Sequence, residues 1–307
     1  MKNYIDEKFY SLVKIIDEKN IYDIYTNMVY KFSKLDILTQ KSIEDFLNKF
    51  KYWGKISISE CNYSVFYEKA NIFKNNLNDY IWLYENLKDY KSKYILFSIL
   101  NNFYCFDFEN LANSMEKIYK HYYDLDLLPN LSHEVFVDVG AFTGDSVLDF
   151  ISTYGKAGYS KIYCYEMSEN NLEFLKVNLN GFNDILFKHN AVTDRVREIT
   201  YDENEDSSAT KEGGKTKRVK GVSLDEDISE NLSLIKMDIE GGEKQALIGA
   251  KKHISQSKPK LLISVYHNNT DLFELPKLIK DFNSSYDLHL RYYGGPIFPT
   301  EIVLICK

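Results

Sequence analysis

From Glu134 onward, short apolar runs rich in β-branched residues alternate with longer stretches that have helical spacing. The run 134–140 precedes the helical stretch 145–155, and the same order repeats along the chain. Further strands are expected at 161–167, 184–192, 232–241 and 258–267, and further helices at 168–182, 242–256 and 271–282. This alternation predicts a doubly wound, mostly parallel α/β sheet. The runs 286–293 and 300–307 follow without a helix between them and predict an antiparallel strand pair at its edge.

The first 125 residues have a different texture. They are rich in Tyr, Phe, Asn, Lys and Leu, contain Gly54 as their one glycine, and repeat apolar residues at helical spacing. We therefore expect two domains: a helical cap or dimerisation region at 1–125 and a sheet domain at 126–307. The segment 119–129 connects them and favours an amphipathic linker helix. The alternative is that its Tyr122, Tyr123 and Asp124 close over a bound ligand.

Composition excludes several classes of protein. The 307 residues include 38 Lys and Arg against 45 Asp and Glu, a formal net charge of −7, which argues against a general nucleic-acid binder. No apolar run approaches the length of a membrane span, and the N-terminus lacks the pattern of a signal peptide. The four cysteines are scattered without a CxxC pair, so neither a disulfide framework nor a zinc site is expected. We expect a cytoplasmic protein.

The polar stretch 201–221 interrupts the alternation. Its flanks have the pattern of a hairpin, with Gly213 and Gly214 as the turn. A solvated hairpin is the simpler interpretation. The alternative places Ser207 and Ser208 near the substrate.

The stretch "DVGAFTGDS" at 138–146 follows the first strand, where ligands bind in doubly wound sheets. Its glycines allow close approach of the backbone, and the free N–H groups at the start of the next helix attract a carboxylate or phosphate. Asp138, just before the first glycine, would repel a pyrophosphate but bind an ammonium group. A carboxylate and an ammonium together form an amino-acid end, which S-adenosylmethionine has.

The ends of the second and third strands extend this site. Glu166 is placed to accept from the two hydroxyls of an adenosine ribose, a device that nicotinamide enzymes share. The absence of GxGxxG favours S-adenosylmethionine, although Glu166 could also be a solvated loop acid. Asn190 and Ala191 would lie near the adenine, or are loop residues without a role in binding.

Several stretches occur in an order that resembles the FkbM family of S-adenosylmethionine-dependent methyltransferases. They are "FVDVGAFTGDSVLDF", "IYCYEMSENNLEFLKVNLN", "HNAVTD", "VKGVSLDE", "LIKMDIEGGEKQALIGAKKHI" and "PKLLISVYH". The resemblance covers Glu134 to the C-terminus. It implies a class I methyltransferase-like Rossmann sheet after the N-terminal helical region, and O-methylation of hydroxyls on sugars, polyketides or related small molecules.

The resemblance also assigns cofactor residues. It places Asp138, Gly140, Gly144, Asp145 and Ser146 on the cofactor loop, with Glu166 as the ribose-binding acid. Ala141, in the same loop, is a further cofactor-binding candidate. Met167 stands where the family commonly has proline, which loosens the loop beyond Glu166.

Methyl transfer to a hydroxyl requires a group that removes its proton. Asp238 and Glu240 follow the fourth strand, and His267 follows the fifth, so we expect these three to be catalytic. Glu243 is equally well explained by its place at a helix N-terminus. Asp238 with His267 could hold a divalent metal, but no ligand spacing demands one, and we predict none.

These features predict an enzyme that methylates a hydroxyl of a small molecule. A sugar or nucleotide-sugar used for surface polysaccharide is the suspected acceptor, with no nucleic-acid partner, no membrane span and a possible homodimer. The alternatives are a nicotinamide-dependent oxidoreductase and a cofactor-binding protein without catalysis.

Overall fold

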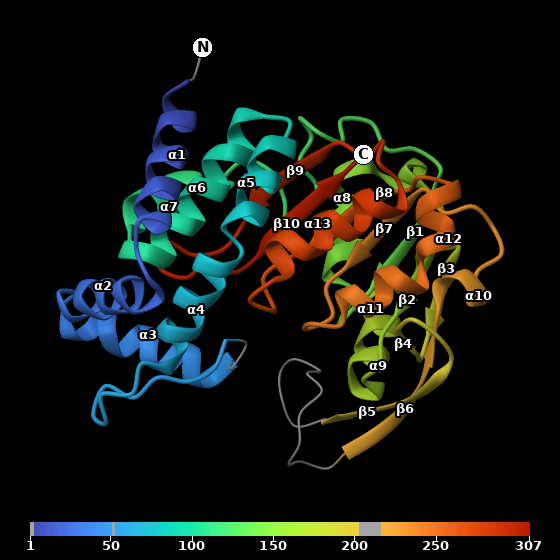
Figure 1. Ribbon diagram of the computed structural model, residues 1–307. Coiled ribbons are helices and arrows are strands. Elements are labelled where there is room, and N and C mark those ends of the chain that lie inside the picture. The colour runs from blue at the N-terminus through green and yellow to red at the C-terminus, as the bar shows by residue number, and fades with distance from the viewer. Residues whose placement is uncertain (1–2, 51–52, 203–215) are drawn as a thin grey trace. The chain divides into compact units, whose positions relative to one another are not determined.

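A computed structural model describes residues 3–50, 53–202 and 216–307 (Figure 1). The chain divides into two compact units. The first consists of Met1–Lys117, Val265–Pro276 and Asp287–Ile302, and the second of Ile118–Ser264, Lys277–Tyr286 and Val303–Lys307. The expected domains were contiguous, with a boundary at 125. In the structure, two later segments belong to the helical unit.

The predicted helices of the first unit are present. They are α1 (Tyr4–Asp17), α2 (Ile21–Ser33), α3 (Ile37–Phe50), α4 (Ser64–Asn75), α5 (Leu77–Asn86), α6 (Tyr90–Cys105) and α7 (Phe108–Ser114). Asn3 and Asn20 accept backbone N–H groups at the starts of α1 and α2. Each helix buries an apolar stripe; in α1, Phe9 and Ile16 are fully buried.

Strand β9 (Leu288–Tyr292) is joined to these helices. Ser92 of α6 accepts a hydrogen bond from Leu290 N at 2.8 Å, and Asp89 pairs with Arg291 at 3.0 Å. Contacts across about 200 residues of sequence therefore tie this C-terminal strand to α6.

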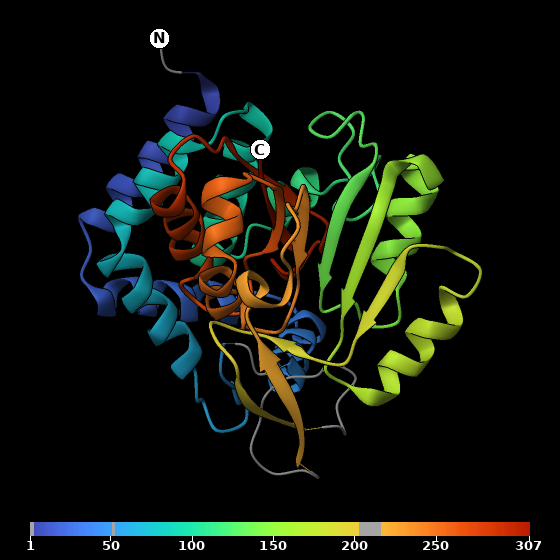
Figure 2. The same ribbon diagram turned by 90° about the vertical axis from the view of Figure 1, so that its right-hand side faces the viewer.

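The described residues form a seven-stranded sheet in the order β3-β2-β1-β7-β8-β10-β9. Besides β9, its strands are β1 (Glu134–Val139), β2 (Tyr159–Tyr165), β3 (Ile185–Lys188), β7 (Leu234–Met237), β8 (Lys260–Ser264) and β10 (Ile302–Cys306). The pairs from β3 to β8 are parallel and β10 is antiparallel to β8, as predicted. Figure 2 shows β1, β2 and β3 side by side. The strand order reverses between β1 and β7, where ligands bind in folds of this kind.

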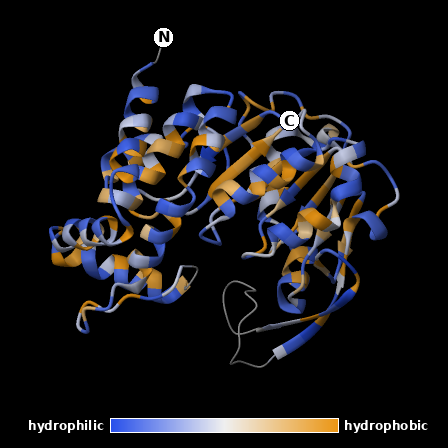
Figure 3. Ribbon diagram, in the orientation of Figure 1, coloured by the Kyte–Doolittle hydropathy of each residue, from blue (hydrophilic) through white to orange (hydrophobic). Residues whose placement is uncertain are grey.

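All but one of the described helices of the α/β part lie close to their predicted places, and the short helix at 224–227 was not predicted. The helices are α8 (Asp145–Tyr154), α9 (Glu169–Asn178), α10 (Leu224–Asp227), α11 (Glu243–Gly249), α12 (Lys251–Gln256) and α13 (Asp271–Phe282). The sheet strands are largely apolar along their length (Figure 3), as expected for parallel strands buried on both faces. Among the described residues, no helix combines the length and the apolar character needed to cross a bilayer.

A small second sheet has the order β4-β6-β5. β5 (Arg197–Asp202) and β6 (Thr216–Val222) are antiparallel, which confirms the predicted hairpin strands, and β4 (Ala191–Val192) pairs with β6. The expected turn at Gly213 and Gly214, and the candidates Ser207 and Ser208, lie outside the described residues.

The expected linker helix at 119–129 is absent from this described segment. The side chain of Asp124 accepts hydrogen bonds from Asp126 N at 2.8 Å and Leu127 N at 3.3 Å, and Tyr122 has φ of +71°. Local bonds of this type compete with helix formation, which explains why the amphipathic pattern was misleading.

Candidate functional site

The glycines of the loop after β1 are required by close packing. Gly140 has φ of +76°, and a Cβ there would lie 2.0 Å from the carbonyl oxygen of Asp238. Gly144 has φ of +91°, and its Cβ would lie 2.9 Å from the Leu175 side chain. Gly140 therefore brings the end of β1 against the end of β7, rather than only against a ligand as the sequence suggested.

Asp138 lies at the end of β1 and is fully buried. Its carboxylate pairs with Lys236 Nζ at 3.0 Å and accepts a hydrogen bond from Ser146 Oγ. Lys236 also donates to the carbonyl of Gly140 at 2.7 Å. Burial lowers the pKa of Lys236, but the negative charges of Asp138 and Asp238 raise it more, so the pKa lies above its ordinary value. The ammonium that Asp138 binds in this structure is thus that of Lys236.

Sequence reasoning missed Lys236. A signal was present, because a lysine inside the apolar run "LIKM" of a parallel strand needs a buried partner. Its partner could not be read from the sequence.

Glu166 follows β2 and is 4% exposed. Its Oε2 accepts a hydrogen bond from Phe142 N at 2.9 Å, and its Oε1 accepts one from Ser168 N at 2.7 Å. Burial raises the pKa of this carboxyl, and the two backbone donors oppose the rise. A carboxylate has about four lone-pair positions, so these bonds leave acceptor capacity on both oxygens.

Asp238 follows β7 and is half-buried, with its backbone N–H bonded to Val139 at the end of β1 at 3.1 Å. Its Oδ2 accepts a hydrogen bond from the Tyr122 hydroxyl at 2.5 Å. The His121 ring stacks on Tyr122 with 3.9 Å between centroids, and burial lowers the pKa of His121 to about 4. A neutral histidine therefore supports the tyrosine that holds Asp238.

Residues 138–289 match the family model of the methyltransferase FkbM domain. This chain carries an FkbM-family methyltransferase domain. No curated protein matches the chain. The family implies S-adenosylmethionine as the cofactor of the domain.

Among solved structures, this chain is similar to an FkbM methyltransferase from Methylobacillus flagellatus, with 26% sequence identity and a TM-score of 0.65. The match covers 77% of this chain and 60% of that one, so the chain spans less than two thirds of that protein. An rRNA methylase from Streptococcus thermophilus is 14% identical, with a TM-score of 0.42 and coverage of 62% and 98%. Aeropyrum pernix fibrillarin, solved with S-adenosyl-L-methionine, is 9% identical, with a TM-score of 0.39 and coverage of 64% and 72%. The fold is that of class I methyltransferases.

Two further acids of the FkbM domain follow Asp238: Glu240 lies in the turn before α11, and Glu243 is the first residue of α11. Glu240 has φ of +57°, and Gly241 has φ of +101°. Glu243 is fully buried, and its Oε1 accepts a hydrogen bond from Ile239 N at 2.8 Å. This bond closes the turn and supports the structural interpretation of Glu243. The catalytic assignment of Glu240 stays a prediction.

The remaining cofactor candidates of the FkbM domain lie near the strand ends. Asn190 Nδ2 donates to the carbonyl of Lys220 at 3.1 Å, and Ala191 begins β4. The carbonyl of Met167 is 3.1 Å from His189 Nε2, and Asp145 is exposed at the start of α8. Their contacts with a cofactor stay predictions.

His267 belongs to the other compact unit, in the segment Val265–Pro276. It follows β8, is 2% exposed, and its ring centroid lies 4.1 Å from that of Tyr266. The joint action of His267 with Asp238 stays a prediction.

Proposed function

We propose that this protein is an S-adenosylmethionine-dependent O-methyltransferase acting on a small hydroxyl-bearing molecule. The narrower form of the proposal is a sugar or nucleotide-sugar acceptor used for surface polysaccharide. The observation that carries the proposal is the carboxylate of Asp238, held by Tyr122 at the switch point beside the loop after β1. The family supports methyl transfer, and the acid at this position favours a hydroxyl acceptor.

The residues around β1 and β2 fit the cofactor. Gly144 precedes α8 without a side chain, so the N–H groups of the first helical turn can receive a carboxylate. Glu166 retains acceptor capacity for the two ribose hydroxyls. Asp138 acts indirectly in this proposal, because its pairing with Lys236 and Ser146 fixes the loop.

When bound, S-adenosylmethionine supplies an electrophilic methyl group. A neutral hydroxyl is a weak nucleophile, so a base must accept its proton as the new bond forms. We assign that role to Asp238, with His267 and Glu240 as further candidates. The Tyr122 hydroxyl fixes one oxygen of Asp238 and thereby orients the carboxylate.

The first test is calorimetric titration of the protein with S-adenosylmethionine, S-adenosylhomocysteine and NAD. We expect the first two to bind and NAD not to bind. Binding of NAD alone would favour the oxidoreductase alternative.

A second experiment tests the acceptor: the protein is incubated with methyl-labelled S-adenosylmethionine and with sugars, nucleotide-sugars and matched amino-sugars. Label on nitrogen only would contradict O-methylation, and binding without any label transfer would support a non-catalytic role.

Replacing Glu166 by alanine is expected to weaken S-adenosylmethionine binding by about 10- to 100-fold. The expected loss corresponds to about 1.5–3 kcal/mol for hydrogen bonds to a charged acceptor. Unfolding should still be cooperative, with some loss of stability, because Phe142 N and Ser168 N lose their acceptor. Calorimetry measures the dissociation constant, and the exposed Glu169→Gln serves as control. An unchanged dissociation constant in Glu166→Ala rejects the ribose assignment.

Replacing Tyr122 by phenylalanine is expected to lower kcat about tenfold, because Asp238 loses an orienting hydrogen bond to a charged group. The dissociation constant for S-adenosylmethionine should stay the same. Tyr119→Phe is the control, since the Tyr119 hydroxyl donates to Asp126 at an exposed position. Equal kcat in both variants would show that Tyr122 does not position the base.

A further inference from the structure

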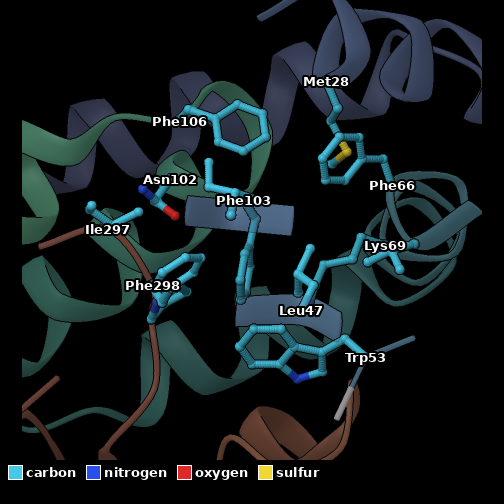
Figure 4. A pocket seen from close by; sticks show the side chains of 13 residues that line it. Met28, Leu47, Trp53, Phe66, Lys69, Asn102, Phe103, Phe106, Ile297 and Phe298 are labelled. Carbon is cyan, nitrogen blue, oxygen red and sulfur yellow. The ribbon is translucent and has the colours of Figure 1, made fainter. Parts of the chain in front are cut away.

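The helical unit contains a cavity of about 50 Å³ with aromatic walls. Figure 4 shows Trp53, Phe103 and Phe298 around it, with Phe66 and Phe106 farther along its lining. Of the described residues that line the cavity, only Lys69 and Asn102 carry polar side-chain groups besides the indole of Trp53. The cavity therefore combines apolar walls with two hydrogen-bond donors, the ammonium of Lys69 and the side-chain amide of Asn102.

Lys69 is a half-buried residue of α4 whose ammonium lies among aromatic rings. Its Nζ is 4.2 Å from the Trp53 ring and 4.1 Å from the Phe103 ring. It donates to Asn269 Oδ1 at 2.9 Å. Within the described part of the chain, Lys69 makes no ion pair with a carboxylate. The rings and one amide leave its charge without a counter-ion.

Asn102 supplies a second donor from α6. It is 3% exposed, and its Nδ2 has no hydrogen-bond partner among the described residues. A buried donor of this kind is costly unless a ligand or water accepts its hydrogen bond. Among the residues that the structure describes, Asn102 thus lacks an acceptor for its amide N–H group, and Lys69 lacks a paired carboxylate.

We infer that this cavity binds the carboxylate end of a small apolar acid. The carboxylate would pair with the Lys69 ammonium beside the rings of Trp53 and Phe103, and the Asn102 amide offers a separate donor elsewhere in the lining. The aromatic walls would cover the apolar part, and a cavity of this size takes only a few heavy atoms. The inference concerns the helical unit alone and does not depend on the proposed methyl transfer.

A pH dependence follows from the surroundings of Lys69. Burial lowers its pKa to about 7, and the carboxylate of Glu68 opposes that shift. No other titratable side chain is among the residues that line the cavity. A carboxylate binds the ammonium form, so affinity is greatest below pH 7 and falls up to tenfold per unit above it. Binding at higher pH must therefore take up a proton.

The test is calorimetric titration of the full chain with acetate, propionate and isobutyrate at pH 6.5 and 8.5. We expect propionate or isobutyrate to bind at pH 6.5 and to bind at least tenfold more weakly at pH 8.5. At pH 8.5, the binding enthalpies measured in phosphate and in Tris should differ. The difference should correspond to the uptake of close to one proton from the buffer. Isobutyramide, which has nearly the shape of isobutyrate but no charge, should bind more weakly and without proton uptake.

Lys69→Met should lower carboxylate affinity at least tenfold and remove its pH dependence. Lys41→Met is the control and should change neither property. Lys41 is an exposed lysine of α3, a helix whose Ile43 and Leu47 line the cavity although Lys41 does not. Absence of binding by all three acids, equal binding of isobutyramide, or unchanged affinity in Lys69→Met would each overturn the inference. If Lys69→Met fails to fold, the pH series and the isobutyramide comparison on the unaltered protein decide it.

Discussion

Replacing Lys236 by methionine is expected to lower the free energy of unfolding by about 3–5 kcal/mol. The substitution leaves the carboxylate of Asp138 without its cation in a site where the two side chains are 0% and 4% exposed. It also removes the hydrogen bond to the carbonyl of Gly140 at the cofactor loop. Denaturant unfolding followed by circular dichroism measures the loss.

A surface pair provides the matched control. Lys176 and Glu173 lie 2.7 Å apart on α9 and are 44% and 67% exposed, so Lys176→Met should cost less than about 1 kcal/mol. Asp138→Asn combined with Lys236→Met removes both charges and should recover part of the stability. If Lys236→Met is as stable as Lys176→Met, the buried pair does not stabilise the loop.

Replacing Asp238 by asparagine is expected to lower kcat by about 10²- to 10⁴-fold, the usual contribution of a positioned base. Asparagine has nearly the same shape and can still accept a hydrogen bond from Tyr122, but it cannot take the proton of a hydroxyl. The dissociation constant for S-adenosylmethionine should change little. Single-turnover transfer of a labelled methyl group, with calorimetry alongside, separates these two effects.

Three companion variants assign the base. Asp149→Asn removes a carboxylate on α8 whose side chain is 40% exposed, and should leave kcat unchanged. Glu240→Gln and His267→Ala test the other catalytic candidates. If His267→Ala loses activity while Asp238→Asn keeps it, then His267 is the base. If neither of these two lowers methyl transfer while the cofactor still binds, the catalytic assignment is wrong.

Much of the α/β architecture could be predicted because parallel strands are buried on both faces. Such strands appear as apolar runs. β1, β7 and β8 each lie within the predicted run, whereas β2 begins two residues before its run at 161–167. The strand ends then indicated Asp138, Glu166 and Asp238. The prediction of a helix at 119–129 was wrong because a helical pattern of apolar residues does not reveal local side-chain hydrogen bonds such as those of Asp124.

Long-range partners could not be predicted. Nothing in the sequence shows that Lys236 pairs with Asp138, or that Tyr122 reaches Asp238 across 116 positions. Nor could the sequence show that residues 265–276 and 287–302 belong to the helical unit. The periodicity of apolar residues predicts the type of an element but not which element packs against it.

That joining bears on how this chain could have evolved. Leu290 and Arg291 lie near the C-terminus, yet their partners Ser92 and Asp89 lie in the helical region. Deleting residues 1–117 would strip β9 of these bonds, so the helices are not an appended module that recombination could add or discard intact. We therefore expect changes in α6 to be accompanied by compensating changes in β9, so that these two segments diverge together.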